Sequence, residues 1–120
     1  MPRLISFAMT TDQVREKTKT VTRRWAWLHA KPGMILTGVE KAMGLKKGEK
    51  IVRLCDIRVI SVRRERLDAM VTDMDYGRKE LQLEGHPFGL TCPAEFVAKL
   101  CKGTKNKPSD LITRIEYEYI

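Results

Sequence analysis

The clearest hydrophobic pattern in the chain lies at its C-terminal end. Residues 111–119 run Leu-Ile-Thr-Arg-Ile-Glu-Tyr-Glu-Tyr, in which the odd-numbered residues are apolar, aromatic or β-branched. Because successive side chains of a strand point to opposite faces, this alternation predicts a strand with one buried face. Shorter runs rich in β-branched and aromatic residues predict further strands over residues 4–8, 19–24 and 34–39.

The longest β-rich stretch covers residues 51–62, and its alternation changes phase part-way along. Apolar residues up to Leu54 fall in one register, whereas those from Ile57 onward fall in the other. One extra residue in the strand, a β-bulge, reconciles the two registers. We therefore expect a long strand that bends near Cys55 and Asp56.

Helical spacing and stop signals account for much of the remaining chain. The Thr10-x-x-Gln13 pattern is typical of a capping box at a helix start. Pro93 opens the clearest helix, whose apolar residues recur at helical spacing until Gly103. Gly85 is placed to end another helix. The predicted helices cover residues 11–17, 63–70, 78–84 and 93–102.

The order of these elements predicts the class of fold. A chain of 120 residues with 42% hydrophobic residues suits one domain with one modest core. Pro32-Gly33 marks a turn, and neither repeats nor a linker divide the chain. We predict a β-rich α+β domain over residues 1–120. Its core is a small mixed β-barrel of five to six strands with short flanking helices. The last strand must return beside an early one if the barrel is to close.

Charge adds information about partners. The chain carries 23 Lys and Arg against 15 Asp and Glu, a net charge of +8, and the excess is concentrated in the first 66 residues. It includes an exposed glycine-bounded loop with Lys46 and Lys47. A basic surface of this size attracts polyanions through steering and counterion release. The charge therefore favours a nucleic-acid partner, RNA or DNA, over an ordinary solvated basic surface.

Several other classes of protein are disfavoured. The three cysteines are odd in number and lack a Cys-x-x-Cys pair, which argues against a disulfide framework or a thiolate metal site. His29 and His86 have no acidic partner at ligand spacing, and the phosphate-loop and dinucleotide motifs are absent. We predict neither a metal nor a cofactor. Without a secretory leader or a long apolar run, we expect a cytoplasmic protein with no membrane partner.

Residues 19–24, Lys-Thr-Val-Thr-Arg-Arg, combine the groups that bind an anion. In an extended strand Thr20, Thr22 and Arg24 share one face, with Lys19 beside them. A guanidinium fork, an ammonium and short hydroxyl donors together can hold a phosphate or an oxyanion. The alternative is an edge strand guarded by charges against aggregation.

The two tryptophans directly follow this strand. Indole rings beside arginines suit the stacking of nucleic-acid bases, although most tryptophans pack in cores. If the strand continues past residue 24, both rings point the same way and form a stacking platform. The residues predicted to contact nucleic acid or ligand are Thr20, Arg23, Arg24, Trp25, Trp27, Lys46 and Lys47.

Glu84 is a third candidate. It sits at a predicted helix end just before Gly85, where a carboxylate interacts unfavourably with the helix dipole. A residue kept in such a position is expected to have a partner, such as Lys19, an arginine or a substrate amide. The alternative is a solvated surface glutamate.

These features resemble the ASCH domain family, which belongs to the PUA-like superfamily. The resemblance spans nearly the whole chain. It rests on the Lys-Thr-x-Thr-x-Arg strand at 19–24, the turn at Pro32-Gly33 and the pair Glu84-Gly85. Residues 39–48 are similar to an insert of the phage and prophage branch. The resemblance implies a β-barrel whose cleft, between barrel and helices, binds RNA or a modified nucleobase.

The resemblance also implies alternatives that involve catalysis. Some small members are amidohydrolases that remove the acetyl group of N4-acetylcytidine, and their catalytic lysine, threonine and glutamate match Lys19, Thr22 and Glu84. Other members are ribonucleases or RNA-binding modules. Residues 25–31 and the lysine loop at 46–50 are additions relative to the smallest amidohydrolases and would reshape the pocket. RNA or nucleobase binding is therefore the first expectation, and deacetylation or RNA cleavage the alternative.

Overall fold

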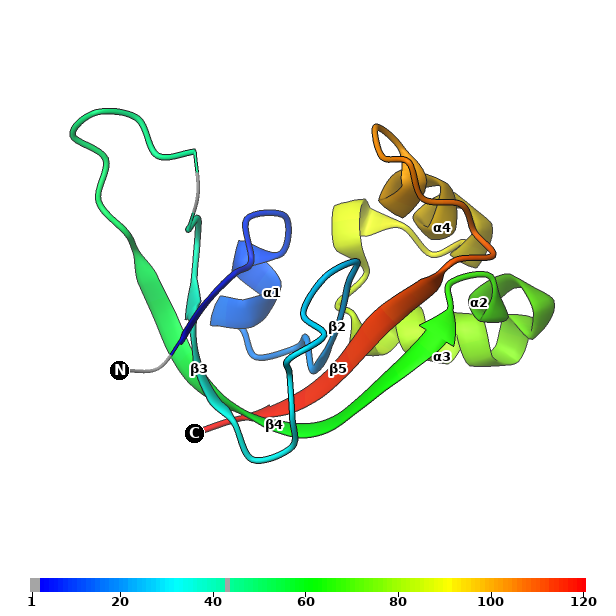
Figure 1. The fold of residues 1–120 in the computed structure, drawn as a ribbon, viewed down its shortest axis with the longest axis horizontal. Coiled ribbons are helices and arrows are strands. Elements are labelled where there is room, and N and C mark those ends of the chain that lie inside the picture. Colours follow the sequence, from blue (N-terminus) through cyan, green and yellow to red (C-terminus); the bar gives the residue numbers. More distant parts are fainter. Residues whose placement is uncertain (1–2, 43) are drawn as a thin grey trace.

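The computed structural model describes residues 3–42 and 44–120. Over these residues the chain forms five strands, four short α-helices and one 3-10 turn (Figure 1). In chain order they are β1 (Arg3–Ser6), α1 (Thr11–Arg15), β2 (Val21–Arg24), β3 (Ile35–Val39), β4 (Arg53–Arg66), α2 (Ala69–Thr72), α3 (Met74–Leu83), η1 (Pro87–Gly89), α4 (Pro93–Cys101) and β5 (Leu111–Tyr119).

The strands form one mixed sheet in the order β1-β3-β4-β5-β2. β1 runs parallel to β3, and the other neighbours are antiparallel. The sheet curls into a half-barrel, and the helices lie on its concave side and beyond one end (Figure 1). The predicted β-rich α+β class is confirmed. β5 does return beside an early strand, since it lies between β4 and β2.

The two edge strands of the half-barrel are joined by a side chain. Arg24 at the end of β2 donates a hydrogen bond from Nη2 to the carbonyl oxygen of Ser6 at the end of β1. Its guanidinium carbon also lies 5.4 Å from the ring centre of Phe7. The guanidinium therefore bridges the opening that the backbone leaves between β1 and β2.

β4 bends twice, and it is longer than predicted. Gly38 pairs with Cys55 and Val39 with Arg53, so Leu54 is the extra residue of a bulge, one position before the predicted bend. A second irregularity at Ile60 interrupts the pairing with β5. The prediction of a helix over residues 63–70 is wrong for its first half. Residues 63–66 pair with β5, and α2 begins only at Ala69.

The predicted capping box does not form. The Thr10 side chain makes no capping hydrogen bond, and Gln13 donates instead to the carbonyl oxygen of Gly85, at 3.1 Å. α1 ends at Arg15, earlier than expected. α3 is longer than expected because the Asp73 side chain accepts from the backbone N–H of Tyr76 and starts the helix there. α4 begins at Pro93 as predicted.

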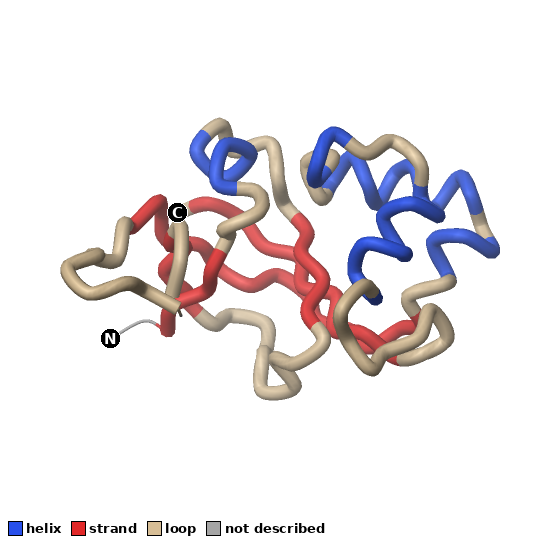
Figure 2. Tube along the Cα trace, turned by 90° about the horizontal axis from the view of Figure 1, so that it is seen from above, coloured by secondary structure: helices blue, strands red, loops and turns tan. Residues whose placement is uncertain are grey.

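The buried residues form two clusters. One fills the half-barrel under α1, and the other joins α2, α3 and α4 to one end of the sheet. Figure 2 shows these three helices gathered at that end, with α1 apart from them. No helix of the described residues has the length and apolar character needed to cross a membrane. The first cluster contains Ile5, Phe7, Val14, Ala30, Leu36, Ile57, Val59, Ile115 and Tyr117. The second contains Leu67, Met70, Leu81, Phe96, Val97 and Ile112.

Candidate functional site

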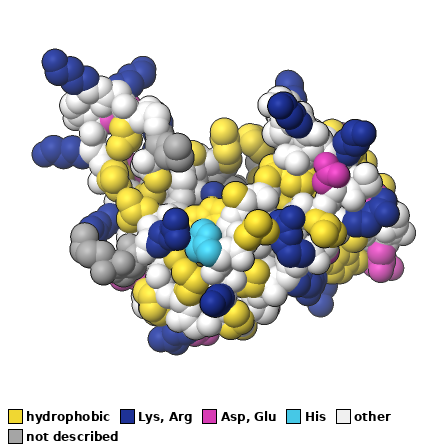
Figure 3. Space-filling view, in the orientation of Figure 1, with side chains coloured by type: hydrophobic (Ala, Val, Ile, Leu, Met, Phe, Trp, Pro, Cys, Tyr) yellow, Lys and Arg dark blue, Asp and Glu magenta, His cyan; other side chains and the backbone are white. Residues whose placement is uncertain are grey.

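A cavity of about 350 Å³ opens where the two clusters meet. Its walls come from the loop after β1, from β2, and from the η1–α4 segment, and the space-filling view shows a hollow on this side of the molecule (Figure 3). Apolar side chains form much of the wall, and a few polar groups converge between them. The apolar residues include Phe7, Trp25, Phe88, Phe96 and Leu100, and the polar ones include Lys19, Thr22, Arg24 and Glu84.

Lys19 and Glu84 form a buried ion pair in this cavity. Lys19 Nζ lies 2.8 Å from Glu84 Oε1 and 3.1 Å from the Glu84 carbonyl oxygen, and both residues are about 2% exposed. The N–H of Thr20 donates to the carbonyl of Leu83, which fixes the approach to β2 against the end of α3. Burial lowers the pKa of Lys19, although the charge of Glu84 opposes that change. The prediction that Glu84 has a cationic partner is confirmed.

A second cation holds the same carboxylate from the other side. Arg23 Nη1 lies 3.0 Å from Glu84 Oε2, and Arg23 Nη2 lies 2.6 Å from Glu80 Oε1. Glu80 in turn accepts from Arg114 Nε at 2.5 Å and Nη2 at 3.1 Å. Burial alone would lower the pKa of Arg23, but Glu84 and Glu80 raise it overall. Arg23 therefore holds Glu84 in place, and its fully buried guanidinium is occupied by carboxylates.

Arg24 and Thr22 line the cavity together. Arg24 Nε donates to Thr22 Oγ1 at 3.2 Å. Within residues 3–42 and 44–120, Arg24 has no carboxylate within 4 Å, and its Nη1 makes no hydrogen bond. Burial lowers the pKa of this guanidinium, which nevertheless keeps its charge. Arg24 thus brings a cation with unused donor capacity to the cavity.

The two tryptophans do not form one platform. β2 ends at Arg24, and the backbone of Trp27 takes a left-handed conformation with a φ of 66°. Trp25 lines the cavity, and its Nε1 donates to the carbonyl of Leu100 at 2.9 Å. Trp27 packs elsewhere, with its ring centre 4.9 Å from that of His29. The expected shared stacking surface is therefore wrong, and only Trp25 belongs to the cavity.

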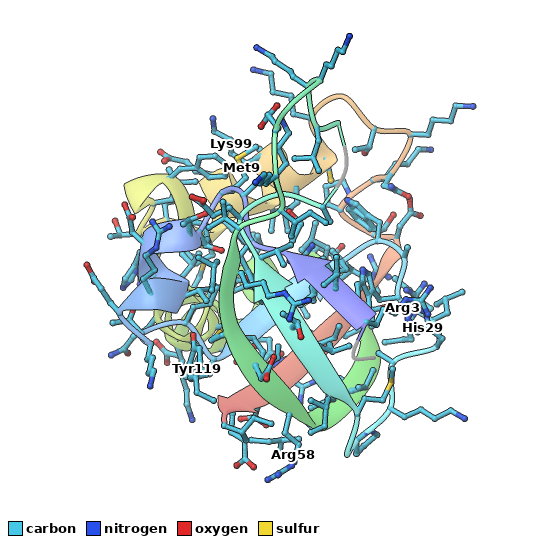
Figure 4. All side chains as sticks on the ribbon, turned by 90° about the vertical axis from the view of Figure 1, so that its left-hand side faces the viewer. Arg3, Met9, His29, Arg58, Lys99 and Tyr119 are labelled. Atoms are coloured by element: carbon cyan, nitrogen blue, oxygen red, sulfur yellow. The ribbon has the colours of Figure 1, made fainter. Side chains whose placement is uncertain are left out.

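The remaining residues predicted to contact nucleic acid or ligand lie outside the cavity. They are Thr20, Trp27, Lys46 and Lys47. The backbone carbonyl of Thr20 accepts a hydrogen bond from the N–H of Tyr117, which holds Thr20 against β5. Arg3 lies over the Trp27 ring, 5.8 Å from its centre, and Figure 4 shows Arg3 and His29 side by side. Lys46 and Lys47, which were predicted to contact the ligand, are exposed in the connection between β3 and β4. They do not line the cavity.

Sequence reasoning missed part of the wall. Phe88 and Lys99 both line the cavity and contact each other, with Lys99 Nζ 4.8 Å from the centre of the Phe88 ring. The glycines that flank His-Pro-Phe at 86–88 were the available signal of a tight turn. The described residues contain no group of three His, Cys, Asp or Glu side chains able to hold a metal ion.

Comparison with known proteins supports the fold. No family model matches the chain, and no curated protein matches it. The solved structures include protein EF3133 from Enterococcus faecalis V583, whose family is designated DUF984. It matches 100% of this chain and 80% of its own length, with a TM-score of 0.65 and 15% identity. The two chains therefore share a fold.

Proposed function

We propose that the cavity binds a single nucleobase, presented either by RNA or by a modified nucleoside. The proposal rests on one observation: aromatic side chains and several polar groups line the same cavity of about 350 Å³. Ligand pockets typically combine apolar walls with a few placed polar groups in this range of volume. A flat heterocycle suits such walls because aromatic rings stack on either of its faces. The resemblance to the ASCH family points to the same use of the cleft.

The polar groups have complementary roles in this proposal. The Glu84 carboxyl group is held by Lys19 and Arg23, and its remaining lone pairs can accept from an exocyclic amino group. Arg24 Nη1 can donate to a base carbonyl, and the Thr22 hydroxyl can do either. A buried set of donors and acceptors discriminates between ligands because a mismatched edge leaves some of them unpaired.

A second candidate function is hydrolysis of the acetyl amide of N4-acetylcytidine. It is favoured by one observation: Lys19, Thr22 and Glu84 line the same cavity. In this scheme Lys19 first passes a proton to Glu84, its partner at 2.8 Å. The neutral amine then takes the Thr22 proton while Thr22 Oγ attacks the amide carbon. The C–N bond then breaks, the amine leaves with the proton from Lys19, and water hydrolyses the threonyl ester. A lowered pKa of Lys19 suits the role of base.

Tryptophan fluorescence tests the first proposal directly. Trp27→Phe leaves Trp25 in the cavity as the single indole, and Trp25→Phe leaves the distant Trp27. Titration with the four ribonucleosides and N4-acetylcytidine should quench the Trp27→Phe protein and leave the Trp25→Phe protein unchanged. Equal responses of the two proteins to every ligand, or none from either, would contradict binding in this cavity.

A matched pair of threonine variants locates the contact. Thr22→Val removes one hydroxyl from the cavity, and we expect it to weaken binding roughly tenfold. Thr37→Val removes a buried hydroxyl that bonds Asp56 outside the cavity, and it should leave affinity unchanged. Mass spectrometry of the same mixtures reports any conversion of N4-acetylcytidine to cytidine. Turnover that survives both Lys19→Ala and Thr22→Ala would refute the hydrolytic scheme.

A further inference from the structure

We propose that Phe88 and Lys99 form a rim that selects nucleotides over nucleosides, with the base in the cavity and its phosphate at Lys99. The inference rests on the proposed function of the cavity and names the class of ligand that it prefers. Three features carry it: the backbone that presents Phe88, the unpaired state of Lys99, and the balance of charge inside the cavity.

Phe88 is presented by a strained backbone. His86 and Phe88 have φ angles of 49° and 58°, in the left-handed region that non-glycine residues rarely adopt, and Gly85 and Gly89 flank them at 80° and 70°. Such conformations persist only where the surroundings enforce them, and they gather at functional sites. Here buried Pro87 anchors the turn, while the Phe88 ring remains 49% exposed at the cavity wall. The part of a half-exposed ring that the Lys99 ammonium does not cover is accessible for stacking.

Lys99 supplies a free cation beside that ring. Its ammonium stands over Phe88 at 4.8 Å, and among the described residues it has no carboxylate within 4 Å. The side chain is exposed on α4 and lines the cavity. Figure 4 shows Lys99 and Met9 on one side of the molecule, where the loop after β1 approaches α4. An incoming anion would therefore meet Lys99 at the mouth.

The charge inside the cavity favours an anionic ligand. The Glu84 carboxylate is in direct contact with Lys19 and Arg23, so this one negative charge faces more than one cation in the cavity. Arg24 within the cavity and Lys99 at its mouth both lack a carboxylate partner among the described residues. A nucleoside brings no charge to this site, whereas a nucleotide brings a phosphate that a lysine binds as a point charge. The base and phosphate of one nucleotide would then match the aromatic wall and the rim.

The test compares each of the four ribonucleosides with its 5′-monophosphate at low salt by isothermal titration calorimetry. The native chain should bind the monophosphate more tightly. Lys99→Gln should reduce that preference by roughly fivefold, the scale of an exposed ion pair. Lys102→Gln is the matched control, because it removes the same charge just past α4 from an exposed residue outside the cavity. It should keep the full preference.

A variant of the ring separates stacking from charge. Phe88→Leu keeps an apolar side chain in the same turn, and it should weaken nucleoside and monophosphate alike. If nucleosides bind but phosphate adds nothing, or if Lys99→Gln and Lys102→Gln behave identically, the rim proposal is wrong and the proposed cavity function stands. If neither class of ligand binds the native chain, the cavity function itself has failed.

Discussion

Five side chains beneath the cavity form a continuous chain of opposite charges. It runs Lys19, Glu84, Arg23, Glu80, Arg114, and each carboxylate contacts two cations. Burying a charge is unfavourable unless it is paired and hydrogen-bonded, so each member depends on its neighbours. One end of the chain reaches the cavity, and the other lies under the helices. The position of Glu84 at the cavity is thereby coupled to the packing of α3.

Glu80→Gln tests that dependence. The substitution leaves two arginines without a full counter-charge, and breaking a buried pair in this way lowers the free energy of unfolding by about 3 kcal/mol or more. Urea denaturation at neutral pH measures the loss. Glu95→Gln, at an exposed position of α4, is the control and should change stability by less than about 0.5 kcal/mol. Similar losses in both proteins would show that the ion chain contributes little.

The same carboxylate predicts a pH dependence. Burial opposes ionisation of Glu80, but hydrogen bonds from Arg114 and Arg23 outweigh it and lower its pKa below the ordinary 4.5. A pKa lowered by folding adds stability above the unfolded value, and this stability is lost as pH falls through the folded value. The native chain should therefore lose stability below pH 4.5. The decline should be shallower in Glu80→Gln, which urea unfolding across acidic pH would reveal.

At the scale of elements, β5 serves both buried clusters. Its first half places Ile112 among α2, α3 and α4, and its second half places Ile115 and Tyr117 inside the half-barrel. Arg114 lies between these halves and reaches Glu80 on α3. β5 lies between β4 and β2 in the sheet, and helices cover part of its length. In that part both faces of the strand are buried. This is why Arg114, expected on the polar face, is only 5% exposed.

Gly77 governs how closely the helices pack. A methyl group at Gly77 would lie 2.0 Å from the carbonyl oxygen of Met70 and 2.9 Å from Pro93 Cγ. The backbones of α2 and α3 cannot approach so closely with any larger residue. We expect Gly77→Ala to destabilise the protein by at least about 2 kcal/mol, since overpacking outweighs the gain in helix propensity. Thermal and urea unfolding measure it.

Gly103→Ala provides the comparison for that prediction. An added methyl group there meets nothing within 4 Å, so only its left-handed backbone, with a φ of 75°, resists substitution. The expected loss is about 1 kcal/mol. Equal losses at the two glycines would mean that the helix contact is not tight.

At the scale of the whole molecule, the chain has a net charge of +8, and Lys and Arg side chains stand on both sides of a hollow (Figure 3). The connection between β3 and β4, with its lysines, rises on one side of the molecule, and α4 rises on the other (Figures 1 and 3). The cavity lies on the α4 side of this hollow. A strand of RNA lying across the hollow would meet cations on both sides while one base entered the cavity.

Salt dependence tests the contribution of the loop. Each phosphate neutralised on single-stranded nucleic acid contributes about 0.7 to the slope of log affinity against log salt. The double variant Lys46→Gln, Lys47→Gln should therefore reduce the slope for a short RNA by about 1.4. Its affinity for free nucleosides should not change, because neither lysine lines the cavity. Fluorescence anisotropy over a salt series gives the slope, and an unaltered slope would show that the loop takes no part in the proposed RNA binding.

Local patterns alone determined several elements of this protein. The alternation at 111–119 predicts β5, and Pro93 with its apolar spacing predicts α4, because period and turn chemistry are properties of neighbouring residues. The phase change near Leu54 predicts the bend of β4 for the same reason. The dipole argument at Glu84 predicts a partner for that carboxylate, a lysine, an arginine or a substrate amide, and the structure shows Lys19 and Arg23 there.

Other features were decided only by tertiary contacts. β4 continues through Arg63 because this residue pairs with β5, although the local sequence pattern predicts a helix there. Trp27 lies outside the cavity because the chain turns after Arg24. Glu80 meets Arg114 because α3 covers the sheet, which no local spacing encodes. Periodicity shows which residues share a face of one element. Which charges meet inside the cavity depends on the element that packs against that face.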